Sequence, residues 1–252
     1  MSQLLNHLNT LTILSLVSIL VSCSSESKTS TLDTENAKAL AEVEANAQVV
    51  KLDSINSIAT WIGSKPTGQH NGYIPVSKGQ LMVNDTEILS GKITFDVMRL
   101  KVMDMQEDTS KQQKLYRHLM NEDFFAADSF PNAQFDIVKI YPFDSTVLSQ
   151  GNSLAIEAFK IDTTAEWRTE EPTHIVTGNL ELRGINKHIA FPVSISDRNG
   201  IIRTEAKLSI DRTDWKLSYR DESSVIDRAK DKFIHNTVHI GLSIRTLPKQ
   251  DQ

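Results

Sequence analysis

The sequence is poor in the residues that hold small domains together covalently or through metal ions, since it has only one cysteine among 252 residues. A single cysteine excludes an intrachain disulfide, a redox-active cysteine pair and a zinc site built from several cysteines. Acidic residues outnumber basic ones by 32 to 27, which gives a formal net charge of −5. Such a chain lacks the broad positive field that nucleic-acid binding uses, so we expect no nucleic-acid partner.

The short motifs that mark common catalytic sites are also missing. The sequence contains no HExxH metal motif, no nucleophile elbow of the form GxSxG and no glycine-rich phosphate loop. A metal site needs three or four converging ligands, and the scattered histidines do not form such a pattern. The sequence therefore predicts no metal, no cofactor and no enzymatic activity.

The one cysteine follows a strongly apolar stretch near the N-terminus. Leu11–Val21 has the length of a signal-peptide core and is shorter than a typical bilayer span. The residues Leu20-Val21-Ser22-Cys23 resemble the lipobox of bacterial lipoproteins, whose signal peptide is cut before a cysteine that is then acylated. An ordinary secretory signal with an incidental cysteine is the alternative. Met1–Thr10 departs from the usual pattern because it contains neither Lys nor Arg.

The lipobox predicts that Cys23 is acylated and anchors the protein to a membrane. Several acyl chains hold an N-terminus stably, since each buried CH₂ contributes about 0.8 kcal/mol. Ser24 follows the cysteine, at the place where an acidic residue is linked to inner-membrane retention in enteric bacteria. We therefore expect a lipid-anchored protein of the bacterial cell envelope, on the outer membrane and facing the periplasm.

Composition divides the chain into four segments. Residues 1–22 are the predicted signal peptide. Residues 23–48 are rich in Ser, Thr, Glu, Ala and Asn, and they offer too little apolar surface to offset the entropy of ordering. We expect 23–48 to be a flexible tether, 49–247 to form one folded domain and 248–252 to be a C-terminal tail.

Apolar residues occupy every second position through much of the 49–247 segment. Ile93, Phe95 and Val97 form one such row, and similar rows surround Phe135, Leu180, Phe191, Leu208 and Ile240. This period is typical of strands with one buried and one wet face. The sequence predicts an all-β domain of antiparallel strands, and we favour a barrel because closure removes exposed edges.

Turn residues and one proline add detail to this fold. The sequences RGINK at 183–187 and DRNG at 197–200 join pairs of strands at hairpin distance. Pro192 interrupts its strand and predicts an edge-like or bulged position, because proline cannot donate to a ladder.

One segment has a helical pattern. Ser110–Met120 is rich in good helix formers and predicts a short helix. Phe124 and Phe125 follow it and need an apolar environment. They are expected either to plug the end of the barrel or to form a lid over a ligand cavity.

Four stretches carry a family resemblance: GQHNG at 68–72, HLMNEDFF at 118–125, GNLELRG at 178–184 and DRTDW at 211–215. In order and spacing they resemble the YceI-like family of bacterial extracytoplasmic proteins, over about residues 49–244. The resemblance implies a lipocalin-like antiparallel barrel of about eight strands with a helix near its mouth. It also implies a long apolar cavity that holds an isoprenoid or another long-chain amphiphile. Residues 150–173 depart from the family, and they predict an added hairpin or a rim loop carrying Phe159 and Trp167.

The alternating rows, the aromatic pair and the resemblance together define a candidate ligand site. Its predicted wall and mouth residues are Ile93, Phe95, Val97, Phe124, Phe125, Phe135, Leu180, Leu182, Phe191 and Leu208. His70 and Arg212 are candidate polar contacts to a lipid head group, although each has a structural alternative, a loop hydrogen bond for His70 and an ion pair for Arg212. The expected partner is a long-chain lipid or isoprenoid, held by a membrane-anchored carrier or buffer. The alternative is a structural or interaction module of the cell envelope, with a barrel filled by its own side chains.

Overall fold

The structure is a computed structural model that describes residues 47–84, 87–144, 153–156, 159–162, 165–223, 226, 229 and 232–248. Every described residue belongs to one compact unit of the chain, within residues 42–252. The predicted signal peptide, Cys23 and almost all of the predicted tether lie outside the described residues.

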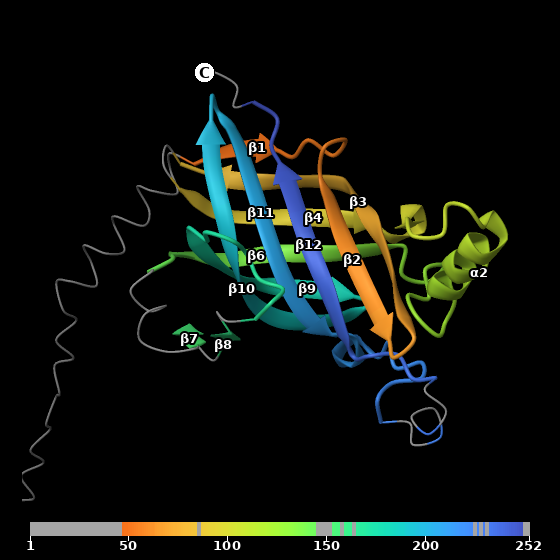
Figure 1. Cartoon of the computed structure of the whole chain (residues 1–252). Helices are drawn as coiled ribbons and strands as arrows, with labels where there is room; N and C mark the ends of the chain where they lie inside the picture. Colours follow the sequence, from red (N-terminus) through yellow and green to blue (C-terminus); the bar gives the residue numbers. More distant parts are fainter. Residues whose placement is uncertain are drawn as a thin grey trace, which may run out of the picture. The chain divides into compact units, whose positions relative to one another are not determined.

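The described part is built almost entirely from strands, with one α-helix and two short 3-10 helices (Figure 1). The elements are β1 (Gln48–Lys51), β2 (Ile58–Lys65), β3 (Gly68–Val83), β4 (Ile88–Asp96), η1 (Val97–Arg99), β5 (Lys101–Val102), α2 (Thr109–Met120), β6 (Asn132–Pro142), β7 (Ser153–Ile156), β8 (Phe159–Asp162), β9 (His174–Leu182), β10 (Ile185–Arg198), β11 (Ile201–Asp211), η3 (Arg212–Trp215) and β12 (Thr237–Arg245).

Eight strands form a closed antiparallel barrel. They follow the order β3-β2-β12-β11-β10-β9-β6-β4, and β4 pairs back with β3 to close the ring. The 16-residue strand β3 makes closure possible, because its first half pairs with β2 and its second half with β4. Two short strands outside this ring also pair with β3. Strand β1 pairs with the second half of β3, and β5 pairs with its first half. The predicted all-β barrel is confirmed.

Both predicted hairpins are present, and their turns suit the twist of the strands. Arg183 and Gly184 join β9 to β10 with φ values of 52° and 69°. Asn199 and Gly200 join β10 to β11 with φ values of 55° and 71°. Two successive positive φ angles are typical of the two-residue hairpin turn that matches right-handed strand twist.

Helix α2 begins one residue before its predicted start and ends at the predicted residue. The Asp108 side chain caps its N-terminus by accepting a hydrogen bond from the Lys111 amide at 3.0 Å. After the helix the chain turns back, and the Phe125 amide donates to the Leu119 carbonyl at 3.0 Å. This return places Phe124 and Phe125 on the same cavity wall as Leu119 of α2 and Arg212 of η3.

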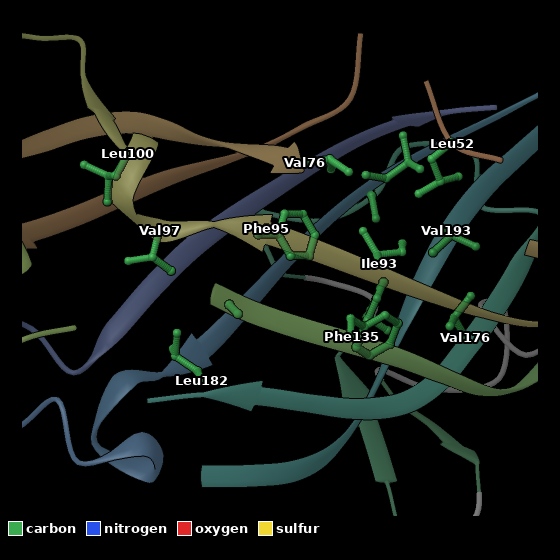
Figure 2. Packing of buried hydrophobic residues seen from close by; sticks show 14 of the residues in the cluster. Leu52, Val76, Ile93, Phe95, Val97, Leu100, Phe135, Val176, Leu182 and Val193 are labelled. Atoms are coloured by element: carbon green, nitrogen blue, oxygen red, sulfur yellow. The ribbon is translucent and has the colours of Figure 1, made fainter. Parts of the chain in front are cut away.

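The barrel interior is closely packed at the end opposite α2. Figure 2 shows Leu52, Val193 and Val176 gathered beyond Ile93 and Phe135, on the side away from Val97 and Leu100. Val193 is 1% exposed. Side chains fill this end, so any cavity must lie nearer to α2.

The connection between β6 and β9 contains a hairpin, β7–β8. A hairpin was one of the two structures predicted for this insertion, the other being a rim loop. The segment that leads from this hairpin back to β9 carries Trp167. It lies on the outer wall of the barrel and not on the predicted rim, because the Trp167 indole donates a hydrogen bond to the Ile240 carbonyl of β12 at 3.1 Å. Beside it, outward-facing Ile175 is fully buried against Tyr141, Phe143 and Ala190. The insertion therefore accompanies a small second core outside the barrel. The side chain of Phe159 lies outside the described residues.

The stretch from Gly68 to Gly72 is strand, so His70 lies within β3 and not in the loop that its structural alternative assumed. The turn is confined to Pro66 and Thr67, and β3 begins directly after it. A glycine is needed at position 72 because a Cβ there would lie 2.7 Å from the Trp61 ring on β2 and still closer to the Lys101 carbonyl.

Candidate functional site

A cavity occupies the part of the barrel nearer to α2. Its volume is about 180 Å³, which is below the range of about 300–1,000 Å³ that ligand sites in proteins commonly have. The wall surface open to the cavity is entirely apolar, so the site offers shape and hydrophobic contact rather than polar recognition.

Most of the predicted ligand-contacting residues lie on this wall. They are Ile93, Phe95, Phe124, Phe125, Phe135, Leu180, Leu182, Phe191, Leu208 and Arg212. The strands bring them together because alternate residues of neighbouring strands point to the same side of the sheet. Figure 2 shows this for Ile93 and Phe95 of β4 and for Phe135 of β6. Their contact with a ligand stays a prediction.

Two aromatic rings form the middle of the wall. The centroids of Phe135 and Phe191 are 5.5 Å apart, and the rings are inclined at 44°. Gly178 leaves room for this pair, because a Cβ at that position would lie 2.5 Å from the Phe135 ring. The absence of a side chain on β9 therefore allows two large rings to face the cavity.

An aromatic cluster covers the α2 end of the cavity. The His118 ring of α2 contacts the rings of Phe124 and Tyr219 edge-on, at centroid distances of 5.0 and 4.6 Å. The His118 imidazole also lies 3.2 Å from an Asp123 carboxylate oxygen. Phe124 is buried and Phe125 is half-buried, and both face the cavity. The cluster joins the segment after α2 to the segment after η3, so it covers the cavity with side chains from two separate parts of the chain.

Arg212 holds this end together through backbone carbonyls. Its guanidinium donates to the carbonyls of His235 at 3.0 Å, Ile234 at 2.9 Å and Leu217. Burial lowers the pKa of the guanidinium, and Asp221, among other nearby carboxylates, opposes this without cancelling it. The aliphatic stem of Arg212 lines the cavity while its charged group is engaged elsewhere. This arrangement favours a structural role over head-group binding, although its partners are carbonyls and not the expected ion pair.

Two predicted site residues do not lie on the cavity wall. His70 is at the rim, where its Nδ1 lies 2.7 Å from the Asp104 carboxylate, which also accepts from the Asn71 amide at 3.1 Å. Val97 is buried but follows the end of β4, and the 3-10 turn η1 takes it out of the strand row. The structure therefore assigns His70 to joining β3 to the segment before α2, and Val97 to the packed core.

Several wall residues were not among the predicted ligand-contacting residues. Those on β2 and β3 are Ala59, Trp61, Gly63 and Ile74. Those on β12 are Val238, Ile240 and Leu242, which the sequence predicted only as an alternating strand row. The period of two in β12 places Ile240 and Leu242 on one face, so the sequence pattern was sufficient to predict that both line the cavity. In β2, apolar residues such as Ile62 also face outward and hide the period. Trp61 has a buried indole nitrogen for which the described residues provide no hydrogen-bond acceptor.

Within the described ranges, no three His, Cys, Asp or Glu side chains come together in a way that could hold a metal ion. In the same part of the chain, no helix has the length and apolarity needed to cross a membrane.

Comparison with known proteins agrees with this fold. The YceI-like domain matches residues 31–246 of the chain. The crystal structure of BcnA from Burkholderia cenocepacia is similar with a TM-score of 0.54 and 16% identity, over 78% of this chain and 99% of that one. A polyisoprenoid binding domain from Saccharophagus degradans implicated in plant cell wall breakdown gives a TM-score of 0.49 and 13% identity, over 80% and 100%. The YCEI protein of Campylobacter jejuni gives 0.39 and 18%, over 65% and 75%. No curated protein sequence matches the chain.

Proposed function

The chain belongs to the YceI-like domain family, and from that premise we propose that its barrel binds a long-chain isoprenoid or a similar amphipathic lipid without covalent attachment. The observation that carries the proposal is the cavity itself, whose exposed wall is entirely apolar and which is closed at one end by packed side chains. Burying apolar ligand surface in such a site is favourable at about 25 cal/mol per Å².

The magnitude of the hydrophobic free energy of binding predicts that the protein carries or buffers the lipid and does not hold it permanently. A chain of about forty carbons at about 0.8 kcal/mol per CH₂ would sum to about 30 kcal/mol. This exceeds the ceiling of about 20 kcal/mol for non-covalent complexes. Chain ordering, incomplete burial and the lipid's favourable state in a bilayer offset the difference. The affinity measured against a membrane is therefore modest, and the lipid exchanges.

The proposal includes attachment to a membrane through Cys23. The lipobox supports acylation, and a protein that exchanges lipid with bilayers gains from staying beside one. The proposed location is the bacterial cell envelope, on the outer membrane and facing the periplasm. A binding function needs no catalytic group, which agrees with a wall that exposes only apolar atoms.

The aromatic residues at the α2 end provide the test. Phe124→Asp combined with Phe125→Asp places two carboxylates against the cavity and should reduce the lipid that co-purifies with the protein, with the barrel still folded. Phe130→Asp is a matched control, because Phe130 is a nearby exposed phenylalanine that does not line the cavity. Lipid is measured by mass spectrometry of organic extracts, and folding by circular dichroism. Undiminished lipid in the double variant would contradict the proposal.

A structural or interaction module of the envelope is the second candidate function. The close packing around Val193 at the far end of the barrel favours it, because side chains already fill that part of the interior. A wild-type protein that takes up neither isoprenoid quinones nor polyprenyl phosphates would support this second function.

A further inference from the structure

One seam of the barrel wall is incomplete. Strands β10 and β11 pair from Arg198↔Ile201 to Ser194↔Glu205, and the register between them goes no further. Toward the α2 end, β10 continues to pair with β9 only, and β11 with β12 only. Over this stretch, within the described residues, no register pair joins the two strands.

Pro192 explains where the ladder stops. If the register continued, Pro192 would face Lys207, and proline has no N–H with which to complete that pair. The hydroxyl of Thr169 takes the place of the missing contact. It accepts from the Lys207 amide at 3.0 Å and lies 2.7 Å from the Pro192 carbonyl, to which it donates. Thr169 is 7% exposed, so this bridge lies within the wall.

The residues around Thr169 form a clasp over the seam, which we define as residues 165–170. Trp167 fastens it to β12 through the 3.1 Å hydrogen bond to the Ile240 carbonyl. The Glu170 carboxylate lies 3.0 Å from the Lys207 ammonium group on β11. A groove separates part of the clasp from β11 and β12, so side-chain contacts rather than a strand ladder hold it.

Both edges of the seam border the cavity. Ile189 and Phe191 of β10 and Leu208 and Ile210 of β11 all line it. The far end of the barrel is filled, and the α2 end is covered by the Phe124 cluster and by Leu217, which Arg212 holds in place. An opening between β10 and β11 would therefore expose the cavity along its length.

We propose that the seam between β10 and β11 is the lateral route by which the lipid chain enters and leaves, and that the clasp closes it. The inference rests on the proposed lipid-binding function and adds the path that the lipid takes. Parting the strands here breaks the Thr169 bridge and the clasp contacts, whereas parting any other pair of the ring breaks a ladder of backbone hydrogen bonds. A sideways opening also lets a long chain pass from a bilayer without threading end-on through the aromatic cluster.

A reversible cross-link tests the route. Ala190→Cys with Ser209→Cys places two thiols across the seam, at positions that would pair if the register continued. A short bis-methanethiosulfonate reagent joins them, and dithiothreitol releases them. The control is Asn179→Cys with His188→Cys, which joins β9 to β10 where they already pair. Both variants retain Cys23, so any reaction at that residue affects them equally.

The probe is all-trans-retinol, a fluorescent isoprenoid alcohol, added to the full chain in detergent. Energy transfer from tryptophan, including Trp61 in the cavity wall, reports binding, and phosphatidylcholine vesicles serve as the acceptor for release. The cross-link across the seam should slow uptake and release at least ~10-fold, as expected when a gating motion is blocked. Dithiothreitol should restore both rates, and the control cross-link should leave them unchanged.

A second set of variants tests the clasp without a cross-link. Thr169→Val removes the bridging hydroxyl and both of its hydrogen bonds at nearly constant volume, and should speed retinol release by about five- to thirtyfold, the equivalent of two lost hydrogen bonds. Thr169→Ser keeps the hydroxyl and should restore the wild-type rate. Thr177→Val is the matched control, since Thr177 is also a buried threonine that contacts a neighbouring strand, through the Lys139 carbonyl at 3.5 Å.

The outcomes separate the two proposals. If retinol binds and the cross-linked seam leaves its uptake and release rates unchanged, the lateral route is wrong and the lipid-binding function stands. If Thr169→Val and Thr177→Val change release equally, the clasp is not specific to the route and the proposal fails. If no form of the protein binds retinol or another isoprenoid, the binding function is overturned and the route with it.

Discussion

Ile93 and Ile244 offer a matched test of whether the barrel is hollow. Each is an isoleucine on a barrel strand and each is 5% exposed, but Ile93 lines the cavity and Ile244 belongs to the packed core outside it. Changing each to alanine removes the same atoms from two environments. The difference in unfolding free energy between the variants therefore reports the packing around each side chain.

The expected magnitudes follow from what surrounds each residue. Removing three methylene-sized groups costs about 2.4 kcal/mol in transfer free energy, at about 0.8 kcal/mol each. A packed site adds a term for the new cavity, so Ile244→Ala should cost about 3–5 kcal/mol. At Ile93 a cavity already exists and less new void is created, so Ile93→Ala should cost little more than the transfer free energy of about 2.4 kcal/mol in the ligand-free protein.

The assay is urea unfolding of protein stripped of lipid, followed by circular dichroism. Both variants should unfold with the slope of the wild type, so that midpoints compare directly. With lipid bound, the loss of unfolding free energy caused by Ile93→Ala should increase, because the wild-type Ile93 side chain then contacts the ligand. The loss caused by Ile244→Ala should stay the same. Equal costs at both positions in lipid-free protein would refute the hollow barrel and favour the structural module.

Two further predictions concern the rim and the anchor. Burial raises the pKa of Asp104, but hydrogen bonds from the His70 ring and the Asn71 amide outweigh it, so the pKa lies below its usual value. The stabilisation is therefore present above the unfolded-state pKa and is lost as the pH falls through the folded-state value. Asp104→Asn should lower the melting temperature near neutral pH by an amount that shrinks toward about pH 3, and a constant difference across this range would contradict the role of the charge. Cys23→Ala should move the protein from the membrane fraction to the soluble fraction once the signal is removed, and a variant that stays membrane-bound would show that acylation is not the anchor.

The sequence predicted the strands best where one face is apolar and the other polar. The rows of β4, β9 and β10 reached the cavity wall as expected, because a one-residue shift would turn every buried side chain outward. The row of β4 was extended one residue too far, to Val97, since alternation does not reveal where η1 begins. Strand β2 was missed because its apolar residues face both ways and hide the period of two.

Pro192 illustrates the difference between predicting a local irregularity and predicting its consequence. The missing N–H was enough to expect an edge-like or bulged position. That Thr169, distant in sequence, fills the resulting gap depends on how the β6–β9 insertion folds over the wall. Arg212 is similar, because its three carbonyl partners come from two loops whose positions no local pattern specifies.

The central claim is that the cavity holds a lipid, and direct extraction of the purified protein tests it best. Full-length protein is purified under mild conditions, extracted with organic solvent and analysed by mass spectrometry, beside the Phe124→Asp/Phe125→Asp variant prepared in the same way. We expect a long-chain isoprenoid or similar lipid to be enriched in the wild-type extract and depleted in the extract of the variant. Extracts with the same lipid content for both proteins, even after incubation with isoprenoid quinones and polyprenyl phosphates, would contradict this claim.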